Sequence, residues 1–229
     1  SYRLNGVLLS YLEMEGEVAS KRGAEGRLYD WGDKSRPSAA SNLIVEEGME
    51  PAEEKLTVVA LGALTNVASA LLQQPELADR ARVYWLGSSY DFETGTMRNV
   101  DFNSVMDVQA LDIVLRSEVE LHIMPTNVAA AMKLDWAEAV AQLEGRHALL
   151  DFLLERWRGH LDGGRRSRVI WDLALNQAML FPDMAEEVEV ELSAEKGGRR
   201  VWIYRDIDAE RMGDEFFQTL QARVEQLRP

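Results

Sequence analysis

The segment from Leu56 to Pro75 constrains the fold more than any other part of the chain. It begins with an apolar run typical of a buried strand, passes through the short turn Gly62–Asn66, and continues with helical periodicity. A strand that leads through a tight turn into a helix is the repeating unit of α/β proteins. In an open parallel sheet, ligands bind in the crevice at the carboxyl ends of the strands. The turn is therefore predicted to lie at a binding crevice, where helix N–H groups favour a polar ligand.

Apolar residues along the rest of the chain alternate between strand-like and helix-like periods. Strands are predicted at residues 17–20, 56–61, 82–86 and 120–124, and an antiparallel pair at 188–192 and 200–204. Helices are predicted at residues 1–14, 38–47, 66–73, 108–116, 135–157 and 216–227, with a strand and helix or a buried helix at 169–177. This order is typical of an α/β fold with an open, mostly parallel sheet and helices on both faces. A chain of this length suits one such domain over residues 1–229.

The start of the chain departs from this pattern. A doubly wound sheet normally begins with a strand and its ligand-facing turn, but this sequence begins with helical periodicity. The first β-α unit is therefore predicted to be missing from the sequence. The first residue is Ser1 rather than Met, so a targeting segment and secretion stay open as alternatives.

Charge and composition limit the possible partners. The formal net charge is −14, and such a surface repels nucleic-acid phosphates and anionic membranes but does not hinder a divalent cation. No apolar run approaches the roughly 20 residues of a membrane-spanning helix. The absence of cysteine excludes disulfides, thiolate metal sites and a cysteine nucleophile. We therefore expect a cytoplasmic protein that binds neither nucleic acid nor membrane.

Residues 101–107 place two carboxylates before a predicted helix. Asp107 is well placed to cap that helix. Asp101 and Asn103 would lie on one side of an extended segment, because side chains two residues apart share a face. A carboxylate beside an amide suits the recognition of vicinal hydroxyls, as in a ribose, and a loop salt bridge is the alternative.

Two further segments have both a functional and a structural interpretation. Asp172 is a hard oxygen ligand that could hold Ca²⁺ or Mg²⁺, or a simple helix cap. Trp171 before it fits either the core or the flat ring of a ligand. In the turn Gly62–Asn66, the glycine could serve only backbone shape, with Thr65 or Asn66 as the helix cap.

The histidines and residues 29–33 give weaker signals. His122 lies in a strand pattern and is predicted to be a satisfied core residue. His147 and His160 flank a charged helix and are predicted to lie on the surface. The aromatic and acidic side chains of residues 29–33 favour a surface turn over the edge of a sugar site.

Several of these segments together resemble the inosine–uridine-preferring nucleoside hydrolase family. The similar motifs are Leu61-Gly-Ala-Leu-Thr-Asn-Val-Ala68, Pro75-Glu76, Val83-Tyr-Trp-Leu-Gly87, Asp101-Phe-Asn103 with Asp107, and Ile170-Trp-Asp-Leu-Ala174. Each motif is weak alone, but five of them in the order of the family, over residues 40–180, are fairly specific.

The resemblance implies an open α/β protein that hydrolyses the N-glycosidic bond of a ribonucleoside. It also implies a homo-oligomer, either a dimer or a tetramer, and a Ca²⁺ ion at the carboxyl end of the sheet. Thr65 would give this ion a backbone carbonyl and Asp172 a carboxylate. Such an ion lowers the pKa of a bound water and anchors the diol oxygens of the sugar.

On the sugar side, the resemblance implies that Asp101 and Asn103 hold the ribose hydroxyls, with Asp101 standing where the family usually has Glu. Leu86 takes a position where a Met commonly lines the sugar site. Trp171 stands where a His often precedes the metal-binding Asp, and a tryptophan cannot act as an acid. The nucleoside would therefore bind against these four side chains without the usual leaving-group acid.

One signature of the family is absent. The motif Asp-x-Asp-x-x-x-Asp-Asp, which would supply most metal ligands and the general base, does not occur in the sequence. No catalytic residue is therefore identifiable here, and the leading interpretation is an N-terminally incomplete nucleoside hydrolase. The alternatives are an inactive relative that binds a sugar or nucleoside or serves assembly, and an unrelated α/β protein whose turns mimic the motif.

Overall fold

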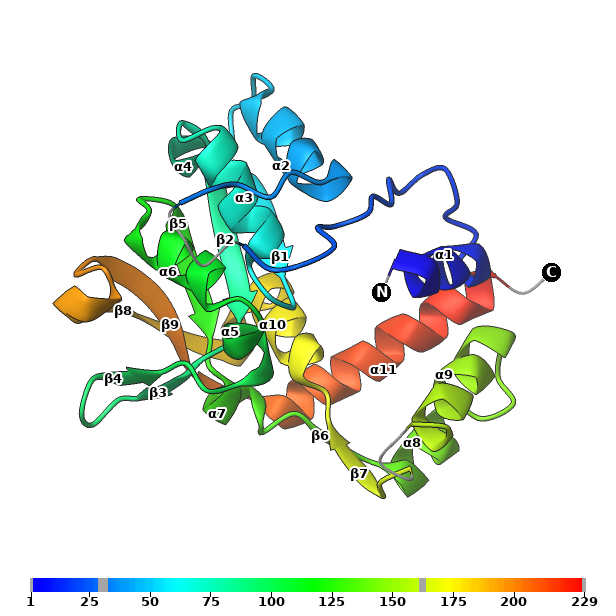
Figure 1. Cartoon of the computed structure of the whole chain (residues 1–229). Coiled ribbons are helices and arrows are strands. Elements are labelled where there is room, and N and C mark those ends of the chain that lie inside the picture. Colours follow the sequence, from blue (N-terminus) through cyan, green and yellow to red (C-terminus); the bar gives the residue numbers. More distant parts are fainter. Residues whose placement is uncertain (1, 29–32, 161–163, 228–229) are drawn as a thin grey trace. The chain divides into compact units, whose positions relative to one another are not determined.

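The computed structural model describes residues 2–28, 33–160 and 164–227, and it divides into two compact units. The first unit comprises Ser1–Ser20, Ala130–Ile170 and Asp208–Pro229, and the second comprises Lys21–Ala129 and Trp171–Ile207. Figure 1 labels their helices and strands. Most of the segment 29–33 lies outside the described residues, so the predicted surface turn there is not described.

The second unit is built on a five-stranded sheet in the order β1-β2-β5-β9-β8. The strands are β1 (Leu56–Ala60), β2 (Ala81–Leu86), β5 (Glu120–Met124), β8 (Ala185–Glu191) and β9 (Arg200–Ile207). Neighbouring strands are parallel except β8, which pairs antiparallel with β9. The mostly parallel sheet predicted from the alternation of patterns is therefore confirmed.

Helices cover both faces of this sheet (Figure 1). The buried side chains of α3 (Thr65–Gln73) and α6 (Val108–Arg116) form one core with inward residues of the strands, and α2 (Ala39–Met49) packs against it. The short helix α7 (Thr126–Ala129) contacts β9, and α10 (Trp171–Leu180) contacts β2. Buried residues of α7 and α10 lie outside that first core, as expected for the opposite face.

The connections after β2 hold more structure than the sequence predicted. A hairpin of β3 (Ser89–Asp91) and β4 (Thr96–Arg98) lies where no strand was predicted. The extended geometry expected for residues 101–103 is wrong, because α5 (Phe102–Met106) begins there with Asp101 as its N-cap. The other elements of this unit are α4 (Leu77–Arg80) and the 3₁₀ turns η1 (Pro182–Met184) and η2 (Ala194–Lys196).

The first unit is mainly helical. It contains α1 (Tyr2–Tyr11), α8 (Trp136–Leu143), α9 (Ala148–Arg158), α11 (Ala209–Gln226) and a small antiparallel pair of β6 (Lys133–Asp135) and β7 (Ser167–Val169). The helix predicted over residues 135–157 is split, because Gly145 between α8 and α9 has a left-handed φ of +69°. The strand predicted at residues 17–20 is wrong, since only an isolated bridge joins Glu15 and Val18.

His122 is a satisfied residue within the sheet, as predicted. Its Nδ1 lies 2.8 Å from Glu187 Oε1, and its Nε2 lies 3.2 Å from Glu120 Oε1. The ring is stacked between Tyr84 and Trp202, with centroids 4.3 and 5.1 Å away. These contacts explain His122 without a catalytic role. In the part of the chain that the structure describes, no helix combines the length and apolar character needed to cross a membrane.

Candidate functional site

The carboxyl ends of β1, β2 and β5 are tied together by hydrogen bonds. The indole Nε1 of buried Trp85 donates to the Gly62 carbonyl at 3.0 Å, which joins the end of β2 to the turn after β1. The Gly87 N–H donates to the Met124 carbonyl at 3.2 Å, which joins β2 to β5. The turn Gly62–Asn66 therefore lies where the sequence predicted it, at the edge where open α/β sheets bind ligands.

Gly62 and Gly87 differ in the space that surrounds them. A Cβ at Gly87 would lie 2.1 Å from the ring of Trp85, so only glycine fits there. A Cβ at Gly62 would have no described atom within 4 Å, and Gly62 has no left-handed φ. Neither backbone shape nor crowding by the described residues explains Gly62. The open space beside it leaves room for a ligand to approach the turn.

This difference gives a paired prediction. Gly62→Ala should leave the fold intact and raise the free energy of unfolding by about 0.4–1 kcal/mol, because alanine restricts the unfolded chain. Gly87→Ala should lower that free energy by about 1–3 kcal/mol, because Trp85 would be pushed from its place. Urea unfolding followed by circular dichroism measures both. Equal destabilisation by the two substitutions would contradict the open space beside Gly62.

A buried carboxylate fixes the start of α3. The Asp107 side chain is 1% exposed and accepts three hydrogen bonds. Thr65 Oγ1 donates to it at 2.5 Å, the Leu28 N–H at 2.9 Å, and the Ala110 N–H at 3.0 Å. The predicted capping of α6 by Asp107 is thus confirmed. The contact with Thr65, which no sequence pattern indicated, also anchors the Gly62–Asn66 turn.

The predicted helix cap at Thr65 or Asn66 is wrong. Helix α3 begins at Thr65, and its N-cap residue Leu64 makes no side-chain capping bond. Asn66 instead binds two residues that precede β1 in the sequence. Its Oδ1 accepts from the Ala24 N–H and from the Ser38 hydroxyl, both at 2.9 Å. Side chains at this turn therefore serve contacts distant in sequence, which local patterns do not reveal.

Asp101 accepts hydrogen bonds from two segments. Its Oδ1 accepts from the backbone N–H groups of Asn103 at 3.0 Å and Ser104 at 3.2 Å. Its Oδ2 accepts from the Ser88 N–H at 2.7 Å and from the Ser104 hydroxyl. The carboxylate thus joins the first turn of α5 to the end of β2.

Asn103 spans the ends of two strands. Its Nδ2 donates to the Leu86 carbonyl at 2.8 Å and, at 3.4 Å, to the carbonyl of Leu61 just beyond β1. Leu86 itself is buried, so its carbonyl is held in place. No described residue donates to Asn103 Oδ1, and this acceptor remains for a ligand.

Trp171 and Asp172 open helix α10. Trp171 is 42% exposed, so the structure excludes the core position that was one interpretation of it. Asp172 is exposed on one side, while protein on its other side removes hydration and raises the pKa of its carboxyl above the ordinary value. Among the described residues nothing donates a hydrogen bond to this carboxylate. A partly desolvated carboxylate to which no described residue donates a hydrogen bond is suited to a cationic ligand.

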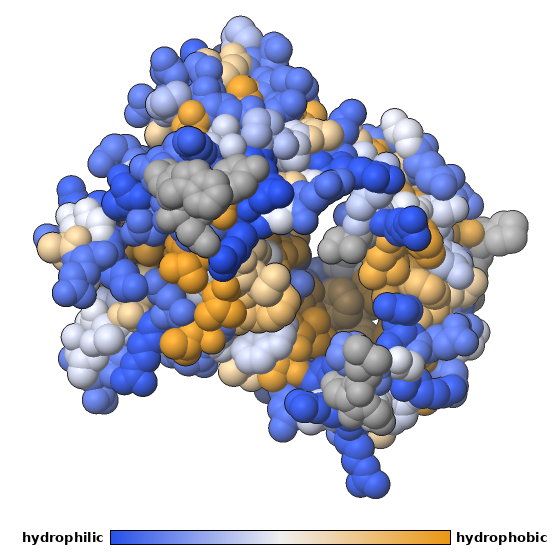
Figure 2. Space-filling view, viewed as in Figure 1, coloured by the Kyte–Doolittle hydropathy of each residue, from blue (hydrophilic) through white to orange (hydrophobic). Residues whose placement is uncertain are grey.

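Apolar surface adjoins this region. Val100, Phe102, Val105, Met106 and Val108 are exposed on and around α5, with Phe102 74% exposed. Figure 2 shows hydrophobic surface gathered on this side of the second unit. Small-molecule sites are typically apolar with a few well-placed polar groups, so Asn103 lies in suitable surroundings.

Comparison with known proteins identifies the family. The sequence profile of the inosine-uridine preferring nucleoside hydrolases matches residues 8–216. The chain belongs to this family. A curated relative, the non-specific ribonucleoside hydrolase RihC of Shigella flexneri, is 26% identical over 185 residues, which cover 78% of this chain and 60% of the relative. The chain therefore spans about 60% of the length of the curated relatives that it matches.

Solved structures of nucleoside hydrolases share the fold. An inosine-guanosine nucleoside hydrolase superimposes with a TM-score of 0.67 at 20% identity, covering 95% of this chain and 84% of that one. The inosine-uridine preferring nucleoside hydrolase of Bacillus anthracis has a TM-score of 0.63 at 21% identity, covering 82% and 66%. These likenesses confirm the α/β fold predicted for this nucleoside hydrolase family member.

The calcium site implied by the resemblance is incomplete in the described part of this family member. No three His, Asp or Glu side chains among the described residues are grouped closely enough to hold a metal ion. Ca²⁺ takes six to eight oxygen ligands, and Thr65 with Asp172 would supply far fewer. The residues present therefore do not fit a complete Ca²⁺ site.

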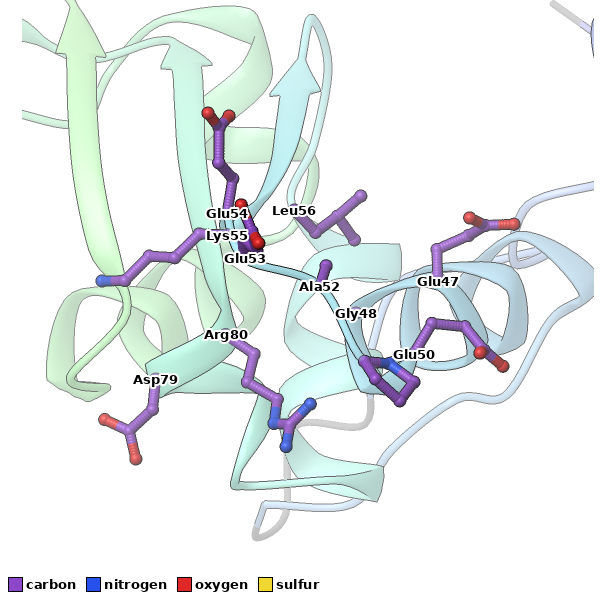
Figure 3. Close-up of a pocket in the computed structure, with 11 residues that line it drawn as sticks. Glu47, Gly48, Glu50, Ala52, Glu53, Glu54, Lys55, Leu56, Asp79 and Arg80 are labelled. Carbon is purple, nitrogen blue, oxygen red and sulfur yellow. The ribbon is translucent and has the colours of Figure 1, made fainter.

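A separate cavity lies at the amino-terminal end of β1. It has a volume of about 600 Å³ and adjoins Leu56, the first residue of β1. Figure 3 shows Glu47 and Asp79 of its lining pointing away from one another. Because it adjoins the amino-terminal end of β1 and not the carboxyl ends of the strands, where open α/β sheets bind ligands, this cavity is not the site of the family.

Sequence reasoning missed two residues of the site. Trp85 was included only as part of a strand motif, yet its indole holds the Gly62 carbonyl. Ser88 was not singled out, although it is 1% exposed and has a left-handed φ of +58°. The one available signal was the run Gly87-Ser88-Ser89 after a strand, which is typical of a turn.

Proposed function

We propose that the complete protein hydrolyses the N-glycosidic bond of a ribonucleoside and releases ribose and the base. The family profile over residues 8–216 supports this, and so does one observation in the structure. Asn103 holds the ends of β1 and β2 with its amide nitrogen and keeps its oxygen uncommitted at the ligand-binding edge of the sheet. Because the chain spans about 60% of its curated relatives, the proposal concerns the complete protein.

The sugar side of this site would be formed by Asn103, Leu86 and Trp171. Asn103 Oδ1 accepts a hydrogen bond from a ribose hydroxyl in this proposal. Leu86 is buried, and its carbonyl holds the Asn103 side-chain amide in place. The exposed indole of Trp171 offers a flat face for the sugar or the base. The preferred base is not part of the proposal.

The chemistry needs a water oxygen to bond to C1′ while the bond from C1′ to the base nitrogen breaks. The attacking water gives a proton to the solvent or to a general base of the protein. The leaving nucleobase gains a proton on the nitrogen that was bonded to C1′. Positive charge develops on the sugar ring, which a nearby carboxylate stabilises. No described residue is assigned as that carboxylate, as the general base or as the acid.

Calcium dependence and self-association belong to the same proposal. The Thr65 carbonyl and the Asp172 carboxylate would be two of the calcium ligands, and the other ligands would have to be supplied elsewhere in the complete protein. A dimer or tetramer would cover the exposed apolar side chains around α5. Nucleic acid and membranes are not partners in this proposal, because the charge of −14 opposes both.

A second function is favoured by one observation. The described residues contain no group of three metal-binding side chains, which suits a family member that binds a sugar or nucleoside without hydrolysing it. Such a protein would bind ribose at the same edge of the sheet. The two functions differ in whether ribose is released from a nucleoside.

Ribose release by the complete protein tests the proposal. Inosine and uridine are supplied as substrates, and reducing sugar is measured for the wild type and for Asn103→Ala. We expect turnover in the wild type and a loss of kcat/KM of about 100-fold in the variant, which is typical of the loss of one polar contact made in the transition state. The control Asp112→Asn, on the exposed side of α6, should match the wild type.

Two results would count against this function. Asn103→Ala with the activity of the control would remove Asn103 from the sugar site. Binding of ribose by the wild type without any release of ribose from nucleosides would favour the non-catalytic alternative.

A further inference from the structure

We propose that Asp101 is a positioning residue that acts through Asn103. Of these two residues, only Asn103 presents an acceptor to the sugar. The proposal rests on the proposed function and deepens it, since it divides the roles of two residues that the sequence had paired as ribose ligands. It is carried by hydrogen bonds already present in the structure without a ligand.

The Asp101 carboxylate has no acceptor capacity left. An ionised carboxylate has about four lone-pair positions. Four donors occupy them: the N–H groups of Ser88, Asn103 and Ser104, and the hydroxyl of Ser104. A sugar hydroxyl could bind Asp101 only by displacing one of these donors. Its N-capping geometry, with φ −75° and ψ 168°, is that of a residue fixed by its own helix.

Ser88 is the second anchor of this arrangement. Its left-handed φ of +58° is costly for a residue with a side chain and persists only where surrounding contacts hold it. Here every polar group of Ser88 has a partner. The N–H donates to Asp101, the hydroxyl donates to Asn99 Oδ1 at 2.9 Å, and the carbonyl accepts from the N–H and hydroxyl of Thr126 at 2.8 and 2.7 Å.

Asn103 is the residue that this network places. The bond from its backbone N–H to Asp101 sets the first turn of α5, and the Nδ2 group then reaches the carbonyls of Leu86 and Leu61. With both amide protons turned toward carbonyls, Oδ1 faces away from them. Asp101 fixes the position of Asn103, and Asn103 provides the acceptor, Oδ1, that a ribose hydroxyl can reach.

Solvent-exchange NMR of the ligand-free chain tests this division. The variants Asp101→Asn and Ser104→Ala both remove donors or acceptors from the network, the second more mildly. We expect the exchange rates of the Ser88 N–H, the Asn103 N–H and the Asn103 side-chain amide to rise about tenfold or more in each variant, which corresponds to about 1.4 kcal/mol. The Ala110 N–H, held by Asp107, should exchange as in the wild type.

The control is Asp112→Asn, which removes an exposed carboxylate on α6 and should change none of these rates. An Asn103 side-chain amide that exchanges as in the wild type in both variants would overturn the proposal. So would a uniform rise across the whole sheet unit, which is the mark of a merely stabilising residue. Because no substrate is used, failure here is separate from failure of the ribosidase activity.

Discussion

Asp107→Ala is expected to lower the free energy of unfolding by about 3–5 kcal/mol, because it leaves three donors in a buried place without an acceptor. The donors are the Thr65 hydroxyl and the N–H groups of Leu28 and Ala110. They come from the segment before residue 29, the start of α3 and the start of α6, so the loss affects three segments together. Urea unfolding followed by tryptophan fluorescence measures the change.

The matched control is Asp112→Ala in the same helix. The Asp112 side chain is half-exposed and pairs with Arg116 at 2.8 Å, and such surface pairs contribute at most about 1 kcal/mol. If the two substitutions destabilised the protein equally, the Asp107 network would not anchor the Gly62–Asn66 turn. If the backbone N–H groups around Thr65 exchanged faster with solvent in Asp107→Ala, this would support the role of Asp107 in holding the Gly62–Asn66 turn.

Asp172→Asn is expected to have the opposite effect, and to stabilise the metal-free protein at neutral pH. Partial loss of hydration raises the pKa of the Asp172 carboxyl in the folded state, so its ionised form opposes folding. An amide of the same shape removes that charge. We expect only a small rise in Tm, because solvent reaches the exposed part of this carboxylate and screens its charge.

The pH dependence gives a check on the cause. Below the ordinary pKa of an aspartate, the carboxyl is neutral in both states and Asp172 costs nothing. As the pH rises toward the higher folded-state pKa, the unfolded state ionises first, so the cost accumulates and is fully present at neutral pH. The difference in Tm between wild type and Asp172→Asn should therefore vanish in acid. A difference that is constant with pH would show that hydration of the carboxylate is not the cause.

Sequence patterns predicted the regular parts of the second unit well. The bounds expected for α6 and β5 agree with the structure, and those of β1, β2 and α3 differ by one residue. These elements have strong apolar periodicity because one face of each helix and alternate positions of the strands pack into a shared core. The helix break at Gly145 was missed, since a single glycine in a helical pattern has several outcomes that depend on its φ.

For the site, sequence patterns provided candidate residues but not the contacts that those residues make. The order of motifs placed Asp101, Asn103 and Asp172 among the candidates, but the roles of the two aspartates differ for reasons that lie far away in sequence. Asp101 is saturated because Ser88 is folded back toward it, whereas no described residue donates a hydrogen bond to Asp172. Such differences depend on tertiary contacts, and residue type or spacing along the chain carries no sign of them.

The proposed function is best tested by calcium-dependent release of nitrophenol from a nitrophenyl riboside, measured for the complete protein and its Asp172→Ala variant. We expect turnover by the wild type that a calcium chelator abolishes and added calcium restores. We expect a loss of about 100-fold or more in the variant, since even residues that only support metal ligands contribute about 10–100-fold. The 229-residue chain alone should show almost no turnover. Activity in Asp172→Ala equal to that of the wild type would contradict the assignment of this carboxylate to the site.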